Sequence, residues 1–387
     1  MGEVDTTDHS VEQLNTLFTR LGVTCKVERT HDKGKHVLAT ASIPKQTDLF
    51  EEAPIVSWPS RGFLTLNVPF CLHCLRRKGD RVGLETGDKG LEWRSCDVCG
   101  SFFCSDSCVS TAKMSHKVLC GTLRDLREDV DGCSSEKGDR GCRSITKESL
   151  ANCVAWVVGR IAESIKQRKF SGRMLEDSHR DSTNSLSRQL FHVVTASFNR
   201  FVDAPKGTEF GDIDPKCWFD DIRKLLKRPC CQTLVGAALP PVSSDASWAL
   251  EIVDGLLREE TLNTFLGILA LNSQGLNGFV IDPPVNGDTS SHSSIEWVLK
   301  GGGIYSLQSN FNHSCQPNVA VFTECGTHDI TLRTLRDVQA GEELTISYIP
   351  VENTNRAERH KMLEGYFFTC QCALCEYEKN LVDTPTA

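Results

Sequence analysis

Eight side chains of the types that bind zinc follow one another at short spacings between residues 71 and 120. They are Cys71, Cys74, Cys96, Cys99, Cys104, Cys108, His116 and Cys120, in the pattern C-x2-C-x21-C-x2-C-x4-C-x3-C-x7-H-x3-C. Thiolates and imidazoles are preferred zinc ligands, and a structural zinc site takes four of them without leaving an open position. One C-x2-C pair can arise by chance in a cysteine-rich chain, but the complete series predicts two structural zinc sites.

A further group of thiols lies near the end of the sequence. The string FFTCQCALC contains Cys370, Cys372 and Cys375, which leave a tetrahedral zinc one ligand short. Cys315 is the obvious fourth donor. It lies in NFNHSCQPN, two residues after a histidine, and taken alone that stretch could equally be a packed turn. Together the two segments predict a third zinc site.

The composition favours metal binding over disulfide bonding for the paired cysteines among the 19 in the chain. The sequence begins MGEVDTTDHS, which is acidic rather than signal-like, so paired cysteines favour metal sites over a disulfide framework.

No apolar run approaches the roughly 18 to 20 residues that cross a bilayer. The formal charge of −8 argues against a general nucleic-acid binder and is compatible with a basic protein partner. We expect a cytoplasmic location, with the nucleus as a second one, and no membrane or nucleic-acid partner.

Periodicity places strands towards both ends of the chain and helices between them. Residues 10–21 have the spacing of an amphipathic helix, and residues 26–58 are rich in β-branched residues and broken by turn residues. The other expected elements are helices over 148–166 and 247–271, strands over 319–324, 330–335 and 344–349, polar connections over 121–146 and 171–188, and a long loop over 282–303.

Several strings of the sequence resemble a known family. NFNHSC, then GEELTISY, then the C-x-C-x2-C pattern resemble a SET-domain protein methyltransferase with its post-SET zinc, and residues 71–120 resemble the MYND zinc finger. The combination resembles the SET and MYND domain family of lysine methyltransferases. The strings GGGIYSLQSNFNHSC and RAERHKMLEGYFFTCQC are most similar to the divergent fifth member of that family. The resemblance covers about residues 25–376 and is most specific in 305–375.

The resemblance implies how the zinc ligands pair. In the finger the pairs interleave, so that one ion is held by Cys71, Cys74, Cys104 and Cys108, and the other by Cys96, Cys99, His116 and Cys120. The post-SET ion is held by Cys315, Cys370, Cys372 and Cys375. Three zinc ions are therefore expected.

The resemblance also implies S-adenosylmethionine as the methyl donor and assigns residues to it. Tyr348 matches the catalytic tyrosine. The cofactor-binding residues are expected to be Gly34, Lys35, Asn272, Asn312, His313, Tyr348 and Phe368. His36 replaces the second glycine of the family's GxG loop, and core packing is the alternative role for Phe368.

The chemistry of methyl transfer explains why such a site needs few reactive groups. The transfer is an in-line displacement that requires a neutral lysine amine close to the sulfonium methyl group. With a reference pKa of ~10.4, deprotonation of a free lysine at pH 7 costs roughly 4.6 kcal/mol, and a dry channel lowers that cost. A tyrosine hydroxyl and backbone carbonyls suffice to orient the amine.

The expected fold is of the α+β class, a β-rich SET pseudoknot with an inserted MYND finger, a helical insert and a post-SET zinc motif. The expected parts are an N-terminal helix with the first part of the SET domain (1–70), the finger (71–120), a linker with the helical insert (121–303), the C-terminal SET core (304–350) and the post-SET region with the tail (351–387).

The function expected from the resemblance is protein-lysine N-methylation by a monomer. The substrate would be a histone tail or a non-histone protein, for which a ribosomal protein is one candidate, and the finger could bind a peptide. The alternative is a non-catalytic zinc adaptor that recruits protein partners. Binding of S-adenosylmethionine separates the two, because a ligand stabilises a protein only if it binds the native state.

Overall fold

The computed structural model describes the following parts of the chain: residues 9–60, 63, 69–78, 91–120, 145–170, 195, 197–210, 214–227, 253–281, 295–323 and 326–382. The chain forms two compact units. Unit 1 comprises Met1–Pro54, Tyr305–Cys325 and Asp329–Ala387, and unit 2 comprises Ile55–Ile304 and Gly326–His328. Unit 1 thus combines segments from both ends of the sequence. The domain boundaries expected from the sequence stay predictions.

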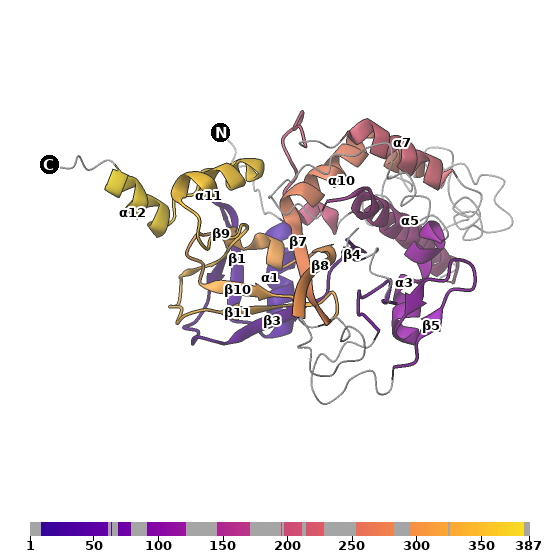
Figure 1. Ribbon diagram of the computed structural model, residues 1–387, viewed down its shortest axis with the longest axis horizontal. Helices are drawn as coiled ribbons and strands as arrows, with labels where there is room; N and C mark the ends of the chain where they lie inside the picture. Colours follow the sequence, from indigo (N-terminus) through magenta and orange to yellow (C-terminus); the bar gives the residue numbers. More distant parts are fainter. Residues whose placement is uncertain are drawn as a thin grey trace, which may run out of the picture. The chain divides into compact units, whose positions relative to one another are not determined.

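Unit 1 contains the N-terminal helix and two small sheets. The helix is α1 (His9–Leu21), as the spacing of residues 10–21 predicts. The first sheet has the order β1 (Cys25–Thr30), β2 (Gly34–Ala39), β12 (Glu343–Ile346) and β9 (Asn312–His313), and the second has the order β10 (Val319–Phe322), β11 (Ile330–Thr334) and β3 (Asp48–Glu52). In both sheets an indigo strand of the N-terminal segment pairs with an orange strand from beyond residue 300, β2 with β12 and β3 with β11 (Figure 1).

The pairing of β9 with β12 brings the two most informative strings of the sequence together. The two strands run parallel, with Asn312 opposite Thr345 and His313 opposite Ile346. NFNHSC therefore lies beside GEELTISY, and Tyr348 follows two residues after the paired segment.

Aromatic side chains connect the helix and sheets of unit 1. Phe18 on α1 is completely buried and meets Phe50 on β3 edge-on, with 5.6 Å between ring centroids. Phe50 in turn lies 6.1 Å from Phe311, which directly precedes β9. Large buried rings of this kind dominate the packing of a small core.

Unit 2 consists of helices around a three-stranded sheet, together with the cysteine-rich segment. The sheet has the order β4 (Val56–Pro59), β8 (Ile295–Ile304) and β7 (Ser273–Ile281), and the helices are α3 (Asp106–Leu119), α5 (Lys147–Phe170), α7 (Pro215–Leu226) and α10 (Glu259–Asn272), with the single turn η2 (Phe198–Arg200). The predicted helix over 148–166 is confirmed. Its residues Leu150, Val154, Val157 and Ile161 are fully buried. Residues 121–144 of the connection predicted over 121–146, the connection predicted over 171–188 and the start of the predicted helix over 247–271 lie outside the described residues.

The long loop predicted over 282–303 is wrong for its second part. Residues 295–304 form β8, which pairs antiparallel with both β7 and β4. The glycines that suggested a loop instead allow backbones to approach closely: a Cβ atom at Gly301 would lie 2.0 Å from the carbonyl oxygen of Trp58. Residues 282–294 lie outside the described part of the chain.

Two helices and a single turn follow β12 in unit 1. They are α11 (Arg356–Leu363), η5 (Glu364–Tyr366) and α12 (Ala373–Val382). Asn355 and Glu358 form a capping box that fixes the start of α11. The mixture of helices and small sheets confirms the predicted α+β class. Within the described residues, no helix combines the length and apolar composition that crossing a membrane requires.

Candidate zinc centres and active site

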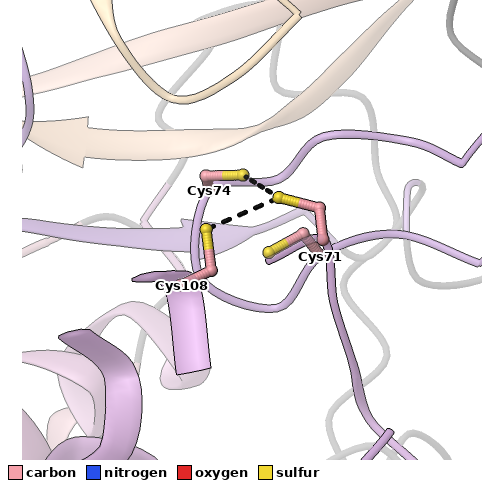
Figure 2. Close-up of side chains that lie close together, drawn as sticks. Cys71, Cys74 and Cys108 are labelled. Atoms are coloured by element: carbon pink, nitrogen blue, oxygen red, sulfur yellow. Dashed lines mark hydrogen bonds between the residues drawn. The ribbon is translucent and has the colours of Figure 1, made fainter. Parts of the chain in front are cut away.

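The structure brings the predicted finger ligands together in two groups of four. Cys71, Cys74, Cys104 and Cys108 form the first group, and Cys96, Cys99, His116 and Cys120 form the second, in the interleaved pairing that the resemblance implies. Figure 2 shows the thiols of Cys71, Cys74 and Cys108 gathered at one point.

The spacing of the ligand atoms matches a tetrahedral ion. A zinc–sulfur bond of ~2.3 Å puts two sulfurs of a tetrahedron about 3.8 Å apart, whereas a disulfide joins them at ~2.05 Å. The Sγ atom of Cys104 lies 3.5 Å from those of both Cys74 and Cys108. In the second group the Sγ atoms of Cys96 and Cys120 are 3.7 Å apart, and the Sγ–Nε2 distance from Cys99 to His116 is also 3.7 Å. Both groups therefore fit zinc.

Local backbone turns set the finger's ligand pairs. After Cys71 the chain turns at Leu75, which has a φ of 60° and donates its backbone N–H to the Cys71 carbonyl. Gly100, with a φ of 71°, closes the turn after Cys96 in the same way. The side chain of Ser105 caps α3 by accepting the backbone N–H of Cys108. Each turn points its thiols to one side, where an ion can bind them.

The third cluster consists of Cys315, Cys370, Cys372 and Cys375. The Sγ atom of Cys315 lies 3.8 Å from that of Cys370 and 3.6 Å from that of Cys375. These distances again match a tetrahedral zinc site. Such an ion would join the turn after β9 to the first turn of α12. Three zinc sites therefore fit the described residues, in agreement with the number predicted.

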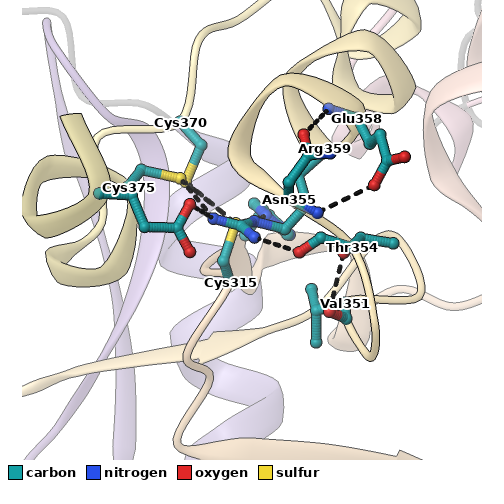
Figure 3. Close-up of polar contacts among 10 residues, drawn as sticks. Cys315, Val351, Thr354, Asn355, Glu358, Arg359, Cys370 and Cys375 are labelled. Atoms are coloured by element: carbon teal, nitrogen blue, oxygen red, sulfur yellow. Dashed lines mark hydrogen bonds and ion pairs between the residues drawn. The ribbon is translucent and has the colours of Figure 1, made fainter. Parts of the chain in front are cut away.

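Arg359 on α11 contacts this third cluster from outside (Figure 3). Its guanidinium group is almost completely buried and donates to the Sγ atom of Cys375, to Glu378 on α12 at 2.7 Å and to the Thr354 carbonyl at 2.7 Å. Zinc with four thiolates carries about two negative charges, which a nearby guanidinium offsets. Arg359 therefore stabilises the cluster electrostatically and links it to two neighbouring segments.

His313 connects the same cluster to the end of β12. Its Nδ1 atom accepts the backbone N–H of Tyr348 at 3.0 Å, so a neutral ring carries its proton on Nε2. Nε2 lies 3.4 Å from the Cys315 Sγ atom. Burial, and to a smaller extent the charge of Arg359, lowers the pKa of His313 to about 4, which keeps the ring neutral. One side chain thus fixes both Tyr348 and a zinc ligand.

Tyr348 lies at the centre of an aromatic group. Its hydroxyl donates a hydrogen bond to the Phe311 carbonyl at 2.7 Å, and burial raises the pKa of that hydroxyl above its ordinary value. The rings of Tyr366 and Phe368 lie 5.0 Å and 6.3 Å from the Tyr348 ring, and Phe368 lies 6.0 Å from His313. Phe368 is 39% exposed, so core packing does not account for all of its surface.

The turn between β1 and β2 lies beside Asn312. The Asn312 amide donates to the Lys33 carbonyl at 3.2 Å and to the Glu343 carboxylate at 3.1 Å, and the Lys33 amine pairs with the same carboxylate at 2.7 Å. Gly34 has a φ of 63°, and no atom lies within 4 Å of the place that its Cβ would occupy. The turn therefore leaves open space at the Cβ position of Gly34.

The structure thus gathers most of the predicted cofactor residues. Gly34, Asn312, His313, Tyr348 and Phe368 belong to one connected group in unit 1, and Lys35 is the half-buried residue after Gly34. Asn272 ends α10 in unit 2, where its amide donates to the carbonyls of Val202 and Ile268, both at 2.8 Å. Its contact with a cofactor stays a prediction.

Arg359 and Tyr366 are site residues that the sequence analysis missed. Both lie in RAERHKMLEGYFFTCQC, a string that the sequence analysis singled out for its family resemblance without assigning a role to either residue. Arg359 contacts Cys375 and Tyr366 contacts Tyr348. Neither pair has the spacing of neighbours on one helix or strand, so periodicity could not predict these contacts. Arg359 is a charged residue on the buried side of α11, and its position on that side was the available sign of a specific role.

Comparison with known proteins identifies the family of the chain. The sequence matches the SET domain family over residues 34–349, more than half of the chain. It is 25% identical over 371 residues to the protein-lysine N-trimethyltransferase SMYD5 of Gallus gallus, which covers 89% of this chain and 83% of that protein. It is 23% identical over 366 residues to the histone-lysine N-methyltransferase ASHR2 of Arabidopsis thaliana, covering 91% of this chain and 72% of that protein. A SET and MYND domain-containing protein of Dictyostelium discoideum is 42% identical over 82 residues, 21% of this chain and 16% of that protein.

Proposed function

Because the chain belongs to the SET domain family, we propose that it transfers methyl groups from S-adenosylmethionine to lysine in a protein. Relatives that are similar over most of the chain are named protein-lysine and histone-lysine N-methyltransferases. The observation that carries the proposal is the assembly of Tyr348, His313 and Asn312 around the junction of β9 and β12.

The residues around Asn312 fit the methyl donor. Gly34, the first residue of β2, has no Cβ and adopts a positive φ. The space that a Cβ would occupy there is open. The Asn312 amide donates to the Lys33 carbonyl and the Glu343 carboxylate, and these two contacts hold its side chain beside the turn. The half-exposed ring of Phe368 offers a surface on which an aromatic base can stack. When bound, the sulfonium supplies the methyl group.

Tyr348 would orient the target amine. Its hydroxyl proton is donated to the Phe311 carbonyl, so the lone pairs of the hydroxyl oxygen are left to accept an N–H from lysine. Holding one N–H in this way turns the nitrogen lone pair towards the methyl group. The raised pKa of Tyr348 keeps the hydroxyl neutral, so it acts by position and does not need to ionise.

His313 and the third zinc site would hold this geometry. His313 fixes the backbone of Tyr348 and points its Nε2 proton at Cys315, and a zinc ion held by Cys315 and Cys370 would tie this residue to the segment that carries Phe368. A misplacement of about 1 Å at such a site can lower the rate by about a hundredfold. A zinc ion at this site would therefore serve methyl transfer by positioning these residues.

The substrate that we propose is a basic region of a histone or of another protein. The formal charge of −8 on this chain favours such a partner through complementary charge. The active form that we propose is a monomer, since Asn312, His313, Tyr348 and Phe368 all come from one chain.

The direct test is transfer of tritiated methyl groups from S-adenosylmethionine to fractionated cell extract. We expect one or a few labelled protein bands, with the tritium recovered in methylated lysine after hydrolysis. Label in another residue type would contradict lysine transfer. If no band is labelled and S-adenosylmethionine gives no thermal shift, the non-catalytic adaptor becomes the better description.

A further inference from the structure

Glu52, the last residue of β3, binds the segment that leads into the active site. Its Oε1 atom accepts the backbone N–H of Leu307 at 2.8 Å, and its Oε2 atom accepts that of Gln308 at 3.0 Å. These two residues are adjacent and lie 255 and 256 positions further along the chain. They open the single turn η4 (Gln308–Asn310), whose first N–H groups have no partner within the turn.

The segment held by Glu52 carries the polar groups of the active site. Phe311 follows η4 directly, and its carbonyl accepts the Tyr348 hydroxyl. Asn312 and His313 come next. Phe50 lies two residues before Glu52, hence on the same face of β3, and its ring contacts that of Phe311. Strand β3 therefore holds this segment at two points.

We propose that Glu52 is a positioning residue for methyl transfer. It fixes Leu307 and Gln308, and so holds the Phe311 carbonyl and the Asn312–His313 pair in the positions that the reaction requires. This inference rests on the proposed function. A carboxylate suits the task because its two oxygens accept two neighbouring N–H groups. An amide in its place presents one oxygen and sets its NH₂ group against a second donor.

The ionisation of Glu52 provides a signature of this role. Burial raises the pKa of Glu52 to about 7, against the opposing effect of the backbone N–H groups of Ser306, Leu307 and Gln308. In the described part of the chain, no charged side chain contributes to this shift: β11 places Ile330 opposite Glu52, its Arg333 pairs with Asp48, and η4 consists of Gln308, Ser309 and Asn310. The exposed Glu51 is on the other face of β3.

Ionisation of Glu52 is expected to raise the activity and to lower the stability of the fold. Above pH 7 the carboxylate is ionised and both of its oxygens accept hydrogen bonds, whereas below pH 7 the protonated group resembles an amide. A carboxyl group whose folded pKa lies above its unfolded value of about 4.5 stabilises the fold below that value, and this contribution is lost as the pH rises through 7. The wild type should therefore gain activity over Glu52→Gln across this range without gaining stability.

The test measures methyl transfer by wild type, Glu52→Gln and the matched control Glu51→Gln from pH 6 to pH 9. Taking the ratio of wild-type to variant rates cancels the ionisation of the substrate lysine. For Glu52→Gln we expect the ratio to rise from about twofold at pH 6 to about tenfold at pH 9, with a Tm at pH 9 no lower than that of the wild type. Glu51→Gln should match the wild type throughout. A ratio that does not change with pH, or an activity loss that follows a lowered Tm, would overturn the proposal.

Amide hydrogen exchange separates this inference from the proposed function. If the wild type transfers no methyl group, the proposed function fails, and the exchange of Leu307 and Gln308 still tests the contact. We expect both amides to exchange faster in Glu52→Gln than in the wild type at pH 8, and to be unchanged in Glu51→Gln. Equal protection of these amides in all three proteins would refute the role of Glu52, whether or not the protein is active.

Discussion

The hydroxyl group of Tyr348 donates a hydrogen bond to the backbone carbonyl of Phe311 across 2.7 Å, although the residues are 37 positions apart. The contact joins the segment after β12 to the segment before β9. Because His313 also accepts the Tyr348 backbone N–H, the tyrosine is fixed at both its backbone and its hydroxyl. This double attachment is the geometric basis of the proposed methyl transfer.

Replacement of Arg359 by methionine should weaken the third zinc site. The variant keeps the length of the side chain but removes the charge beside Cys375 and the bonds to Thr354 and Glu378. Loss of such a second-layer contact lowers metal affinity by about 10- to 100-fold. Zinc released to a chelator should show one ion lost early from Arg359→Met. Lys361→Met, which removes an exposed charge from the same helix, should retain all three ions at wild-type affinity. Equal release from both variants would exclude this role.

Replacement of Gly34 by alanine should impair cofactor binding. An alanine at a φ of 63° destabilises the fold by about 1 kcal/mol, and its Cβ enters the open space at the turn whose Lys33 carbonyl binds Asn312. Gly207→Ala is the matched control, because Gly207 also has a positive φ, of 81°, and an unobstructed Cβ position, but lies in unit 2. Calorimetric titration with S-adenosylmethionine should show weaker binding for Gly34→Ala alone. Similar affinities in the two variants would argue against a cofactor contact at this turn.

Replacement of Gly301 by alanine should severely destabilise the sheet of unit 2. The new Cβ would lie 2.0 Å from the Trp58 carbonyl oxygen, so β4 and β8 must move apart, at a cost of about 3 kcal/mol or more. Gly275→Ala places its Cβ 3.4 Å from Leu299 and should be tolerated. Urea unfolding of both variants tests the difference, and a Gly301→Ala protein as stable as Gly275→Ala would contradict the close approach.

The zinc ligands and the β9–β12 junction could be predicted because their chemistry is restrictive. Few residue types bind zinc, and three closely spaced thiols need a fourth ligand, so Cys315 could be assigned to Cys370, Cys372 and Cys375 from the sequence, whereas the pairing in the finger was implied by the resemblance. The α+β class followed from strand patterns at both ends of the chain. Tyr348 and the Asn312–His313 pair were identified by resemblance, and the structure adds their mutual contacts.

Other features could not be predicted because they depend on partners far away in the sequence. Glu52 and Arg359 look like ordinary charged residues until Leu307 and Cys375 are placed beside them. The glycines at 301–303 suggested a loop, since composition alone does not distinguish a flexible turn from a close approach of two strands.

The most direct test of the proposed mechanism is the single-turnover methyl transfer rate of Tyr348→Phe, measured with cofactor affinity on the same preparation. The variant loses the hydroxyl and its bond to Phe311 but keeps the ring, so stability should fall by only about 1 kcal/mol. We predict wild-type binding of S-adenosylmethionine and a transfer rate reduced by about 100-fold or more. Tyr377→Phe, the same change at an exposed tyrosine, should leave the rate unchanged. A Tyr348→Phe protein that transfers methyl groups at the wild-type rate would contradict the central role of this hydroxyl.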